Sequence, residues 1–247
     1  MKSVGFIGKT DKTELVGYVS KIVASTGKKV IMIDATNIQK TRYTIPTIDE
    51  MEVDSQYVIQ FDNIDIAVGF SNILELKKYL LSKGEDFNEY DYVIIDTDQE
   101  EMIDEYDLKS ANALFFVSSY DKLHIRKGIE LLRFLCATKR KVEPNGIVTI
   151  NKIVYFSDIN TADARYFEQL SENLPIEWTG KQLNYPYDQG DLSVNIQNQY
   201  SNKFDIRMLS KTYKEAIANT VEVITEESGS EIRKVMKNVE KNARFSI

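Results

Sequence analysis

The chain has 247 residues, of which 43% are hydrophobic and 28% are charged, and this is enough apolar material for one large folded core. Its formal net charge of −7 disfavours binding through bulk charge to nucleic acid, which we therefore do not expect as a partner. The single cysteine, Cys136, excludes an internal disulfide, and no stretch reaches the roughly 20 apolar residues of a membrane span. We expect a cytoplasmic protein.

Short apolar runs alternate along the chain with segments of helical period. The expected strands cover residues 3–8, 28–34, 56–61, 65–70, 90–96, 112–119 and 146–156. The expected helices cover a segment with Leu15, Val19 and Ile22 on one face, then 72–84, 122–139, 161–174, about 210–226 and about 231–244. Because the strands lack internal alternation, we expect a doubly wound, mostly parallel α/β sheet with helices on both faces.

The sequence predicts a single domain, because Gly and Pro are sparse and no linker or repeat interrupts the pattern. Residues 1–226 would form this α/β domain, and residues 227–247 a hinge and a basic amphipathic C-terminal helix. In 231–247, Ile232 and Met236 recur at helical spacing among lysines and arginines. Such a helix can lie on an anionic membrane, here the inner face of the cell membrane. Its apolar face is thin, so docking on the protein's own body or on a partner is the favoured interpretation.

Lysines, threonines and acids stand where the predicted strands end. They are Lys9, Thr10, Lys12 and Thr13 after the first strand, Asp34 at the end of the second, and Asp96 at the end of a later one. In an open parallel sheet, ligands bind outside the carboxyl ends of the strands. A lysine-bearing loop beside two acids provides the groups that metal-assisted phosphate binding requires.

Four segments in this order resemble the MinD/ParA group of P-loop ATPases, whose phosphate loop reads K-G-G-x-G-K-[ST]. They are the loop with Lys12 and Thr13, "VIMIDATNIQ" (30–39), "YDYVIIDT" (90–97) and "NYPYDQGDLSVNIQNQ" (184–199). The resemblance implies a P-loop NTPase-like fold and a homodimer. It also implies Mg-ATP as cofactor, with Lys12 on phosphate, Thr13 and Asp96 on the metal, and Asp34 orienting water.

The loop departs from the pattern of the family. Asp11 replaces the glycine before Lys12, the Gly-Gly pair is missing, and the spacing of Lys9 does not match the signature lysine. Glycine is needed there because the backbone takes positive φ and approaches phosphate closely. Thr36 replaces the second acid of the D-x-D pattern that begins at Asp34, and eleven acids with no Lys or Arg lie between Glu85 and Asp107.

Three interpretations of the loop stay open: a working ATPase site, a site that binds nucleotide without turnover, and a turn that only joins strand to helix. The third is favoured, because Asp11 or Thr10 can cap the helix, with Glu14 in a capping-box arrangement. Asp34 and Asp96 can likewise cap the helices that follow them. His124 is the only histidine and is expected on a helix surface, and Cys136 in the core.

Three hypotheses of function follow. The first is a scaffold with no cofactor, or with weak binding of Mg-ATP, that shows little or no hydrolysis and positions or assembles a cell-envelope machine through protein partners. Proteins that resemble it occur among the pilus and secretion assembly factors of the Tad type. The second is a Mg²⁺-dependent ATPase that acts as a spatial switch. The third, DNA partition, needs a basic surface that the net charge does not indicate.

Overall fold

The computed structural model describes residues 1–46, 55–157 and 164–242. The strands in these ranges are β1 (Lys2–Ile7), β2 (Val30–Ala35), β3 (Tyr57–Phe61), β4 (Ile64–Val68), β5 (Tyr92–Thr97), β6 (Ala113–Ser119), β7 (Val148–Tyr155) and β8 (Ile176–Tyr185). The α-helices are α1 (Thr13–Ala24), α2 (Ile73–Ser82), α3 (Glu100–Glu105), α4 (Lys122–Val142), α5 (Ala164–Ser171), α6 (Gln189–Tyr200), α7 (Lys211–Thr225) and α8 (Gly229–Asn242).

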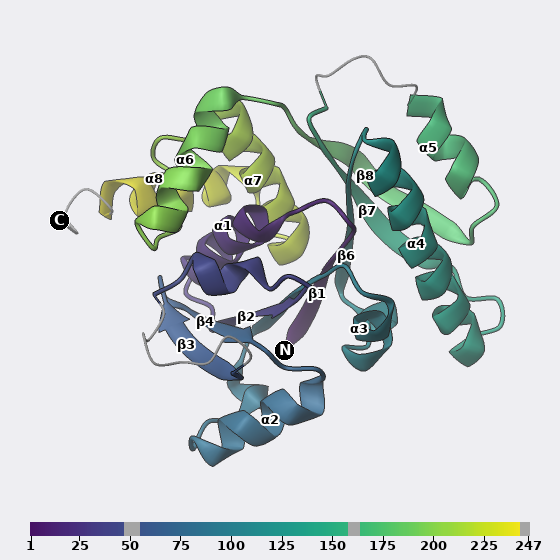
Figure 1. Cartoon of the computed structure of the whole chain (residues 1–247). Helices are drawn as coiled ribbons and strands as arrows, with labels where there is room; N and C mark the ends of the chain where they lie inside the picture. The colour runs from purple at the N-terminus through teal and green to yellow at the C-terminus, as the bar shows by residue number, and fades with distance from the viewer. Residues whose placement is uncertain (47–54, 158–163, 243–247) are drawn as a thin grey trace.

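The strands form one sheet in the order β3-β4-β2-β5-β1-β6-β7-β8. Every neighbouring pair is parallel except β3 and β4, which form an antiparallel hairpin at one edge. The strands β2 to β5 lie on one side of β1 and the strands β6 to β8 on the other, so the order in which strands are added reverses at β1. The carboxyl ends of β1, β2 and β5 lie side by side at the centre of the sheet (Figure 1). This confirms the predicted doubly wound, mostly parallel α/β fold.

Helices cover both faces of the sheet (Figure 1). One buried cluster joins side chains of α1, α7 and α8 to one face, and a second cluster joins α2, α3, α4 and α5 to the other. In the first cluster Phe6 and Phe115 of neighbouring strands stack at 4.8 Å between ring centroids. The apolar strand runs of the sequence are therefore buried from both sides, as their lack of alternation predicts.

Two elements that border the site have no strong signal in the sequence. β8 mixes polar and apolar residues, because it is the edge strand of the sheet and is only partly covered. α6 lacks an apolar stripe and is held by polar contacts instead. Its Asp188 cap accepts a hydrogen bond from the Asp191 N–H at 3.0 Å, and the Asn198 amide donates to the Tyr18 hydroxyl at 2.8 Å.

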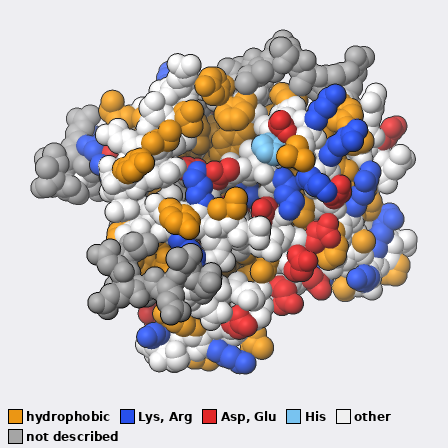
Figure 2. All heavy atoms as spheres, viewed as in Figure 1, with side chains coloured by type: hydrophobic (Ala, Val, Ile, Leu, Met, Phe, Trp, Pro, Cys, Tyr) orange, Lys and Arg blue, Asp and Glu red, His pale blue; other side chains and the backbone are white. Residues whose placement is uncertain are grey.

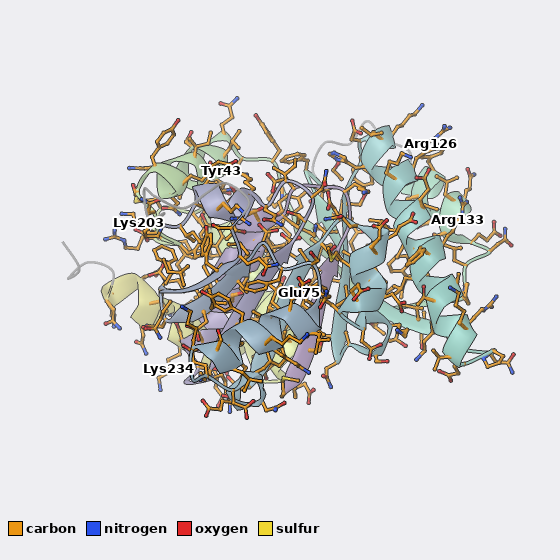
Figure 3. The ribbon with its side chains drawn as sticks, turned by 60° about the horizontal axis from the view of Figure 1, so that its bottom comes forward. Tyr43, Glu75, Arg126, Arg133, Lys203 and Lys234 are labelled. Atoms are coloured by element: carbon orange, nitrogen blue, oxygen red, sulfur yellow. The ribbon has the colours of Figure 1, made fainter. Side chains whose placement is uncertain are left out.

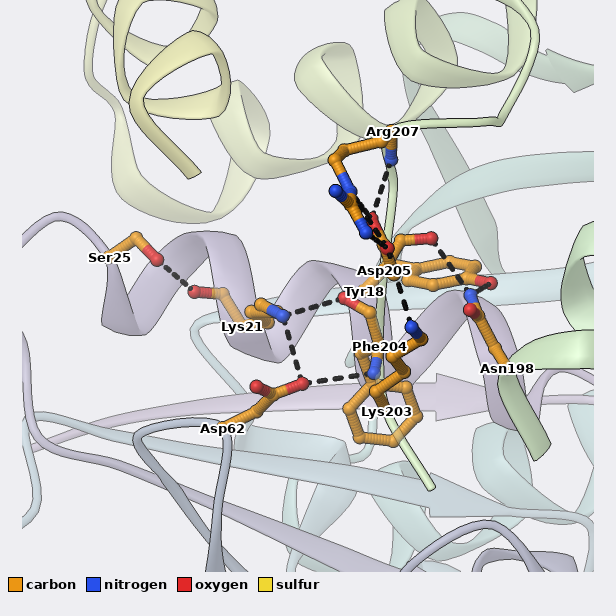
Figure 4. Close-up of polar contacts among 9 residues, drawn as sticks. All are labelled: Tyr18, Lys21, Ser25, Asp62, Asn198, Lys203, Phe204, Asp205 and Arg207. Carbon is orange, nitrogen blue, oxygen red and sulfur yellow. Dashed lines mark hydrogen bonds and ion pairs between the residues drawn. The ribbon is translucent and has the colours of Figure 1, made fainter. Parts of the chain in front are cut away.

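The segment between α6 and α7 is tied to α1 and to the β3–β4 turn (Figure 4). The Lys21 ammonium donates to Asp62 Oδ2 at 2.9 Å and to the Phe204 carbonyl at 2.7 Å. Asp62 Oδ2 also accepts from the Phe204 N–H at 2.9 Å, and the Asn198 amide donates to the Asp205 carbonyl. These contacts hold the segment that follows α6 beside the C-terminal half of α1, and so help to position α6, one wall of the candidate site.

The C-terminal helix α8 lies against the body of the protein. Ile232 and Met236 are buried in the cluster formed with α1 and α7, and the Arg233 guanidinium pairs with Glu215 of α7. Lys234, on the opposite side, is exposed (Figure 3). Docking on the protein's own body or on a partner was the favoured interpretation of this segment. Residues 243–247 lie outside the described residues. Within the described ranges, no helix is long and apolar enough to cross a membrane.

Candidate functional site

The loop between β1 and α1 begins with Gly8, which has a φ of +148°. A Cβ atom at this position would collide with the carbonyl oxygen of Val117 on β6. The Gly8 N–H donates to the Thr97 carbonyl of β5 at 3.2 Å. The loop therefore leaves the sheet between β5 and β6, the strands on either side of β1. Gly8 therefore serves the close approach of the loop to the sheet, whereas the glycines of a phosphate loop serve the approach of phosphate.

Lys12 turns inward to Asp96. Its Nζ lies 2.7 Å from Asp96 Oδ1 and donates to the Gly8 carbonyl at 3.1 Å, and both charged side chains are almost fully buried, at 2% and 1% exposed. Complete burial raises the pKa of Asp96 to about 7, although the nearby Lys12 charge lowers it. The contact has ion-pair distance without hydrogen-bond geometry, so neither Asp96 oxygen has a hydrogen bond within the described residues.

The carboxylate of Asp11 occupies the N-terminus of α1. Asp11 Oδ1 accepts from the Thr13 N–H at 3.2 Å, and Lys40 Nζ lies 2.6 Å from both Asp11 Oδ2 and Glu14 Oε1. Burial raises the pKa of Asp11, but the Lys40 charge and these hydrogen bonds outweigh it and hold the pKa below its ordinary value. The N-cap of α1 is Lys12, whose side chain makes no capping hydrogen bond, and Asp11, one residue earlier, accepts from the first N–H of the helix instead. Glu14 does not complete a capping box, because it pairs with Lys40 and accepts from the Gln199 amide.

Lys9 and Thr10 lie in the same loop but differ in their surroundings. The Lys9 ammonium donates to the Asp98 carbonyl, and Asp98 Oδ1 accepts from the Asn37 N–H at 2.9 Å. These contacts connect the loops that follow β1, β2 and β5. The hydroxyl of Thr10 is buried and has no hydrogen-bond partner among the residues that the structure describes.

Asp34 is fully buried, and both of its oxygens hold the turn after β2. Oδ1 accepts from the N–H and the hydroxyl of Thr36 at 3.0 and 2.6 Å, and Oδ2 accepts from the Thr41 N–H at 3.0 Å. Asp34 and Asp96 are register partners on neighbouring strands, so the structure does bring the two acids side by side. The contacts of Asp34 are those of a capping residue, which was the alternative to orienting water.

Two adjoining hollows lie at this end of the sheet. The smaller, of about 110 Å³, is bordered by Lys12, Thr13, Asp96 and Asp98. The larger, of about 260 Å³, lies between the start of α1, the end of β7 and α6. Thr10, Asp11 and Lys40 line both. Figure 2 shows hydrophobic side chains beside the pale-blue histidine on this face, with acidic and basic groups between them.

The lone His124 and Cys136 take no part in the loop. His124 Nδ1 is hydrogen-bonded to the Ser119 hydroxyl at 2.8 Å, at the start of α4. Cys136 is buried as expected, and burial raises the pKa of its thiol to about 11. Within the described ranges, no group of three or more His, Cys, Asp or Glu side chains could hold a metal ion.

Lys40 and Asp98 complete the charge pattern of the site, and the sequence did not mark them as site residues. Lys40 lies in the short 3-10 helix Lys40–Tyr43, 29 residues from its partner Asp11. No motif or spacing connects the two. The only signal was indirect: a carboxylate in an anion-binding position needs a cation nearby.

Solved structures of the MinD/ParA type share this fold. The MinC:MinD cell division protein complex of Aquifex aeolicus matches with a TM-score of 0.63 at 16% identity, covering 92% of this chain and 97% of that chain. A ParA family ATPase of Chlorobium tepidum matches with a TM-score of 0.57 at 14% identity, covering 92% of this chain and 98% of that chain. A putative plasmid partition protein of Borrelia burgdorferi bound to AMPPNP matches with a TM-score of 0.55 at 18% identity, covering 91% of this chain and 98% of that chain. No family model and no curated protein matches the sequence.

These likenesses define the fold. The chain has a MinD/ParA-like, P-loop NTPase-type fold, as the sequence resemblance implied. Identities below 20% establish the fold and leave the activity to be argued from the site.

Proposed function

We propose that this protein is a scaffold with a MinD/ParA-like fold that binds nucleotide weakly or not at all and shows little or no hydrolysis. One observation carries the proposal: the charges of the phosphate loop are satisfied by the protein's own side chains. The Lys12 ammonium pairs with Asp96, and the Asp11 carboxylate lies at the N-terminus of α1 with Lys40 as its counter-ion.

A bound phosphate chain would compete with these internal contacts. It would have to displace the Asp11 carboxylate from the Thr13 N–H or lie beside it, where two anions repel. It would also have to draw Lys12 away from Asp96, and removing one partner of a buried ion pair costs about 3–5 kcal/mol. The donor set, as arranged, therefore does not fit Mg-ATP, and we derive no catalytic step through it.

A Mg²⁺-dependent ATPase that acts as a spatial switch is the second candidate, and one observation favours it. Asp96 Oδ2 has neither a hydrogen bond nor an ion-pair contact within the described residues, because Lys12 lies on Oδ1, and Thr13 borders the same hollow. A divalent cation there would satisfy the carboxylate with hard oxygen ligands. In that arrangement Thr13 and Asp96 would hold the metal, and Lys12 would be released to phosphate.

Calorimetric titration of Mg-ATP separates the two candidates. The samples are the native protein, Lys12→Ala, and the charge-balanced variant Lys12→Met/Asp96→Asn, which leaves no unpaired buried charge. We expect no heat of binding below about 1 mM ATP in any of them. Micromolar binding by the native protein that both variants lose would support the ATPase instead.

The scaffold would act through protein partners in positioning or assembling a cell-envelope machine of the pilus or secretion type, as a homodimer or in a larger complex. The fold supports this proposal in general terms, because one of the similar structures is a complex of MinD with MinC. Peripheral membrane contact through 231–247 would require α8 to leave the cluster that buries Ile232 and Met236. We therefore propose that recruitment uses the face around the loop.

A further inference from the structure

The larger hollow has an aromatic lip and an apolar rim. Tyr155, Phe156 and Tyr187 follow one another from the buried wall of the hollow to its lip, with ring centroids 6.0 Å and 5.4 Å apart, and only Phe156 and Tyr187 are exposed. Leu192 and Ile196 of α6 form the rim and are 47% and 46% exposed. Exposed apolar side chains that adjoin a hollow mark a binding surface more often than scattered ones do. We call this region the aromatic pocket.

Phe156 is held in an unusual backbone conformation at the lip. Its φ is +55°, in the left-handed region that favours glycine, and its ring is partly exposed against Tyr187. Holding a bulky residue there costs about 1–3 kcal/mol, and such conformations cluster at binding sites. The strain presents an aromatic face at the mouth of the pocket that ordinary strand geometry would turn elsewhere.

The charge of the aromatic pocket is negative. Its lining carries four carboxylates, of Asp11, Glu14, Asp188 and Asp191, but only one lysine, Lys40. Lys40 is shared between Asp11 and Glu14. Asp188 uses Oδ1 to cap α6, and no hydrogen bond to its other oxygen exists within the described ranges. Negative charge beside aromatic faces favours a cation and opposes a phosphate chain.

An unsatisfied polar group lies at the inner end. The Thr10 hydroxyl is in a side chain only 6% exposed, and it has no hydrogen-bond partner in the described part of the chain. Thr10 lines both hollows, so it stands where they join. A buried hydroxyl without a partner costs about 1–3 kcal/mol, and a ligand N–H donor would satisfy it.

We propose that the aromatic pocket receives an arginine side chain of a protein partner, with apolar residues on either side of that arginine packing on Leu192 and Ile196. A planar guanidinium stacks on aromatic faces and offers several N–H donors, to Asp188 at the mouth and to Thr10 inside. Lysine has the charge but neither the plane nor the fork of donors. This inference rests on the proposed function, because it assigns the chemistry of the partner to the scaffold.

The test uses three probes on the full-length protein, followed by ¹H–¹⁵N NMR shifts. They are acetyl-Leu-Arg-Leu-amide, its neutral match acetyl-Leu-Gln-Leu-amide, and adenosine. We expect the arginine probe to shift the Phe156, Tyr187 and Ile196 amides and to bind at least about fivefold more tightly than the glutamine probe. Added salt should reduce this preference, because it screens the charges.

Matched variants locate the binding. Asp188→Asn keeps an acceptor for the α6 cap but removes a charge. It should weaken the binding of the arginine probe about threefold. Ile196→Ser should weaken both tripeptides. Glu101→Gln and Met208→Ser remove an exposed acid and an exposed apolar side chain outside the pocket, and should change neither affinity.

Three outcomes would overturn the inference: equal affinity for the two tripeptides, tighter binding of adenosine than of the arginine probe, or probe binding that weakens as protein concentration rises because a second copy fills the pocket. None of these decides the proposed function, which depends on the Mg-ATP titration. Conversely, Lys12-dependent ATP binding would overturn the scaffold even if the arginine probe bound.

Discussion

At the scale of single residues, the buried pair of Lys12 and Asp96 dominates the loop. Two charges taken out of water stabilise a fold little as a pair, but each becomes costly when the other is removed. Both were candidate ligand-binding residues in the sequence, and the structure brings them within 2.7 Å. Because the two side chains lie this close, they could act together on a ligand, but they also neutralise one another's charge.

Asp96 predicts a pH dependence of stability. Burial raises its pKa to about 7, above the value of about 3.9 in an unfolded chain. The folded state therefore binds more protons between these values, so the contribution of Asp96 to stability is complete below pH 4 and is lost as pH rises through 7. Relative to Lys12→Met/Asp96→Asn, the free energy of unfolding should fall by about 2 kcal/mol from pH 5 to pH 7.

Urea denaturation at a series of pH values checks this, and the double variant cancels the titration of all other groups. A difference that stays constant, or that grows with pH, would show that Asp96 remains ionised in the folded protein.

At the scale of elements, the turn from β1 to α1 is determined by packing against β6. Gly8→Ala places a Cβ against the backbone of Val117 at a positive φ, where no side-chain movement can relieve the contact. We expect a loss of about 3 kcal/mol or more in the free energy of unfolding, measured in urea.

Gly84→Ala is the matched control, because Gly84 also has a positive φ, of +80°, but a Cβ there meets nothing within 4 Å. Gly84→Ala should lower the free energy of unfolding by only about 1 kcal/mol. Equal losses in the two variants would mean that the conformation matters and the approach to β6 does not.

The helix α4 gives a second prediction at this scale. Cys136 is buried in its inner face, and burial raises the thiol pKa to about 11, so little of the reactive thiolate exists near neutral pH. Ellman's reagent should label the native protein at least about a hundredfold more slowly than the denatured chain. Arg126 and Arg133 extend outward from α4 (Figure 3). Rapid native labelling would contradict the buried position.

At the scale of the whole molecule, α8 acts as part of the core. Ile232 is 0% exposed and Met236 5% exposed against α1 and α7. Ile232→Ala should cost about 2–4 kcal/mol by thermal or urea denaturation, because a buried apolar side chain is lost. Lys234→Gln, on the exposed side of the same helix, should cost less than about 0.5 kcal/mol.

The same packing predicts the behaviour towards membranes. We expect the full chain and Lys234→Gln, which removes an exposed charge of the α8 segment, to pellet equally with anionic liposomes, because the apolar face of α8 is engaged. Pelleting that Lys234→Gln reduces would mean that α8 detaches, and would restore membrane contact as its role.

Much of the architecture could be predicted because its causes are local. Unbroken apolar runs such as 90–96 predict buried parallel strands, and acids after such runs predict the edge where a site would lie. β8 and α6 escaped prediction because polar contacts and the sheet edge hold them. The Asp188 cap and the Asn198 contacts leave no periodic trace in the sequence.

The sequence by itself determined the doubly wound sheet, the position of the loop, and the presence of Asp11 where an anion would bind, because strand burial and residue identity are read residue by residue. Only the tertiary structure decided which side chains of the loop and the pocket meet. Lys12 with Asp96, Asp11 with Lys40, and Phe156 with Tyr187 are brought together by separate crossovers of one sheet. Pairing energies depend on distance in space, and separation along the chain does not reveal that distance.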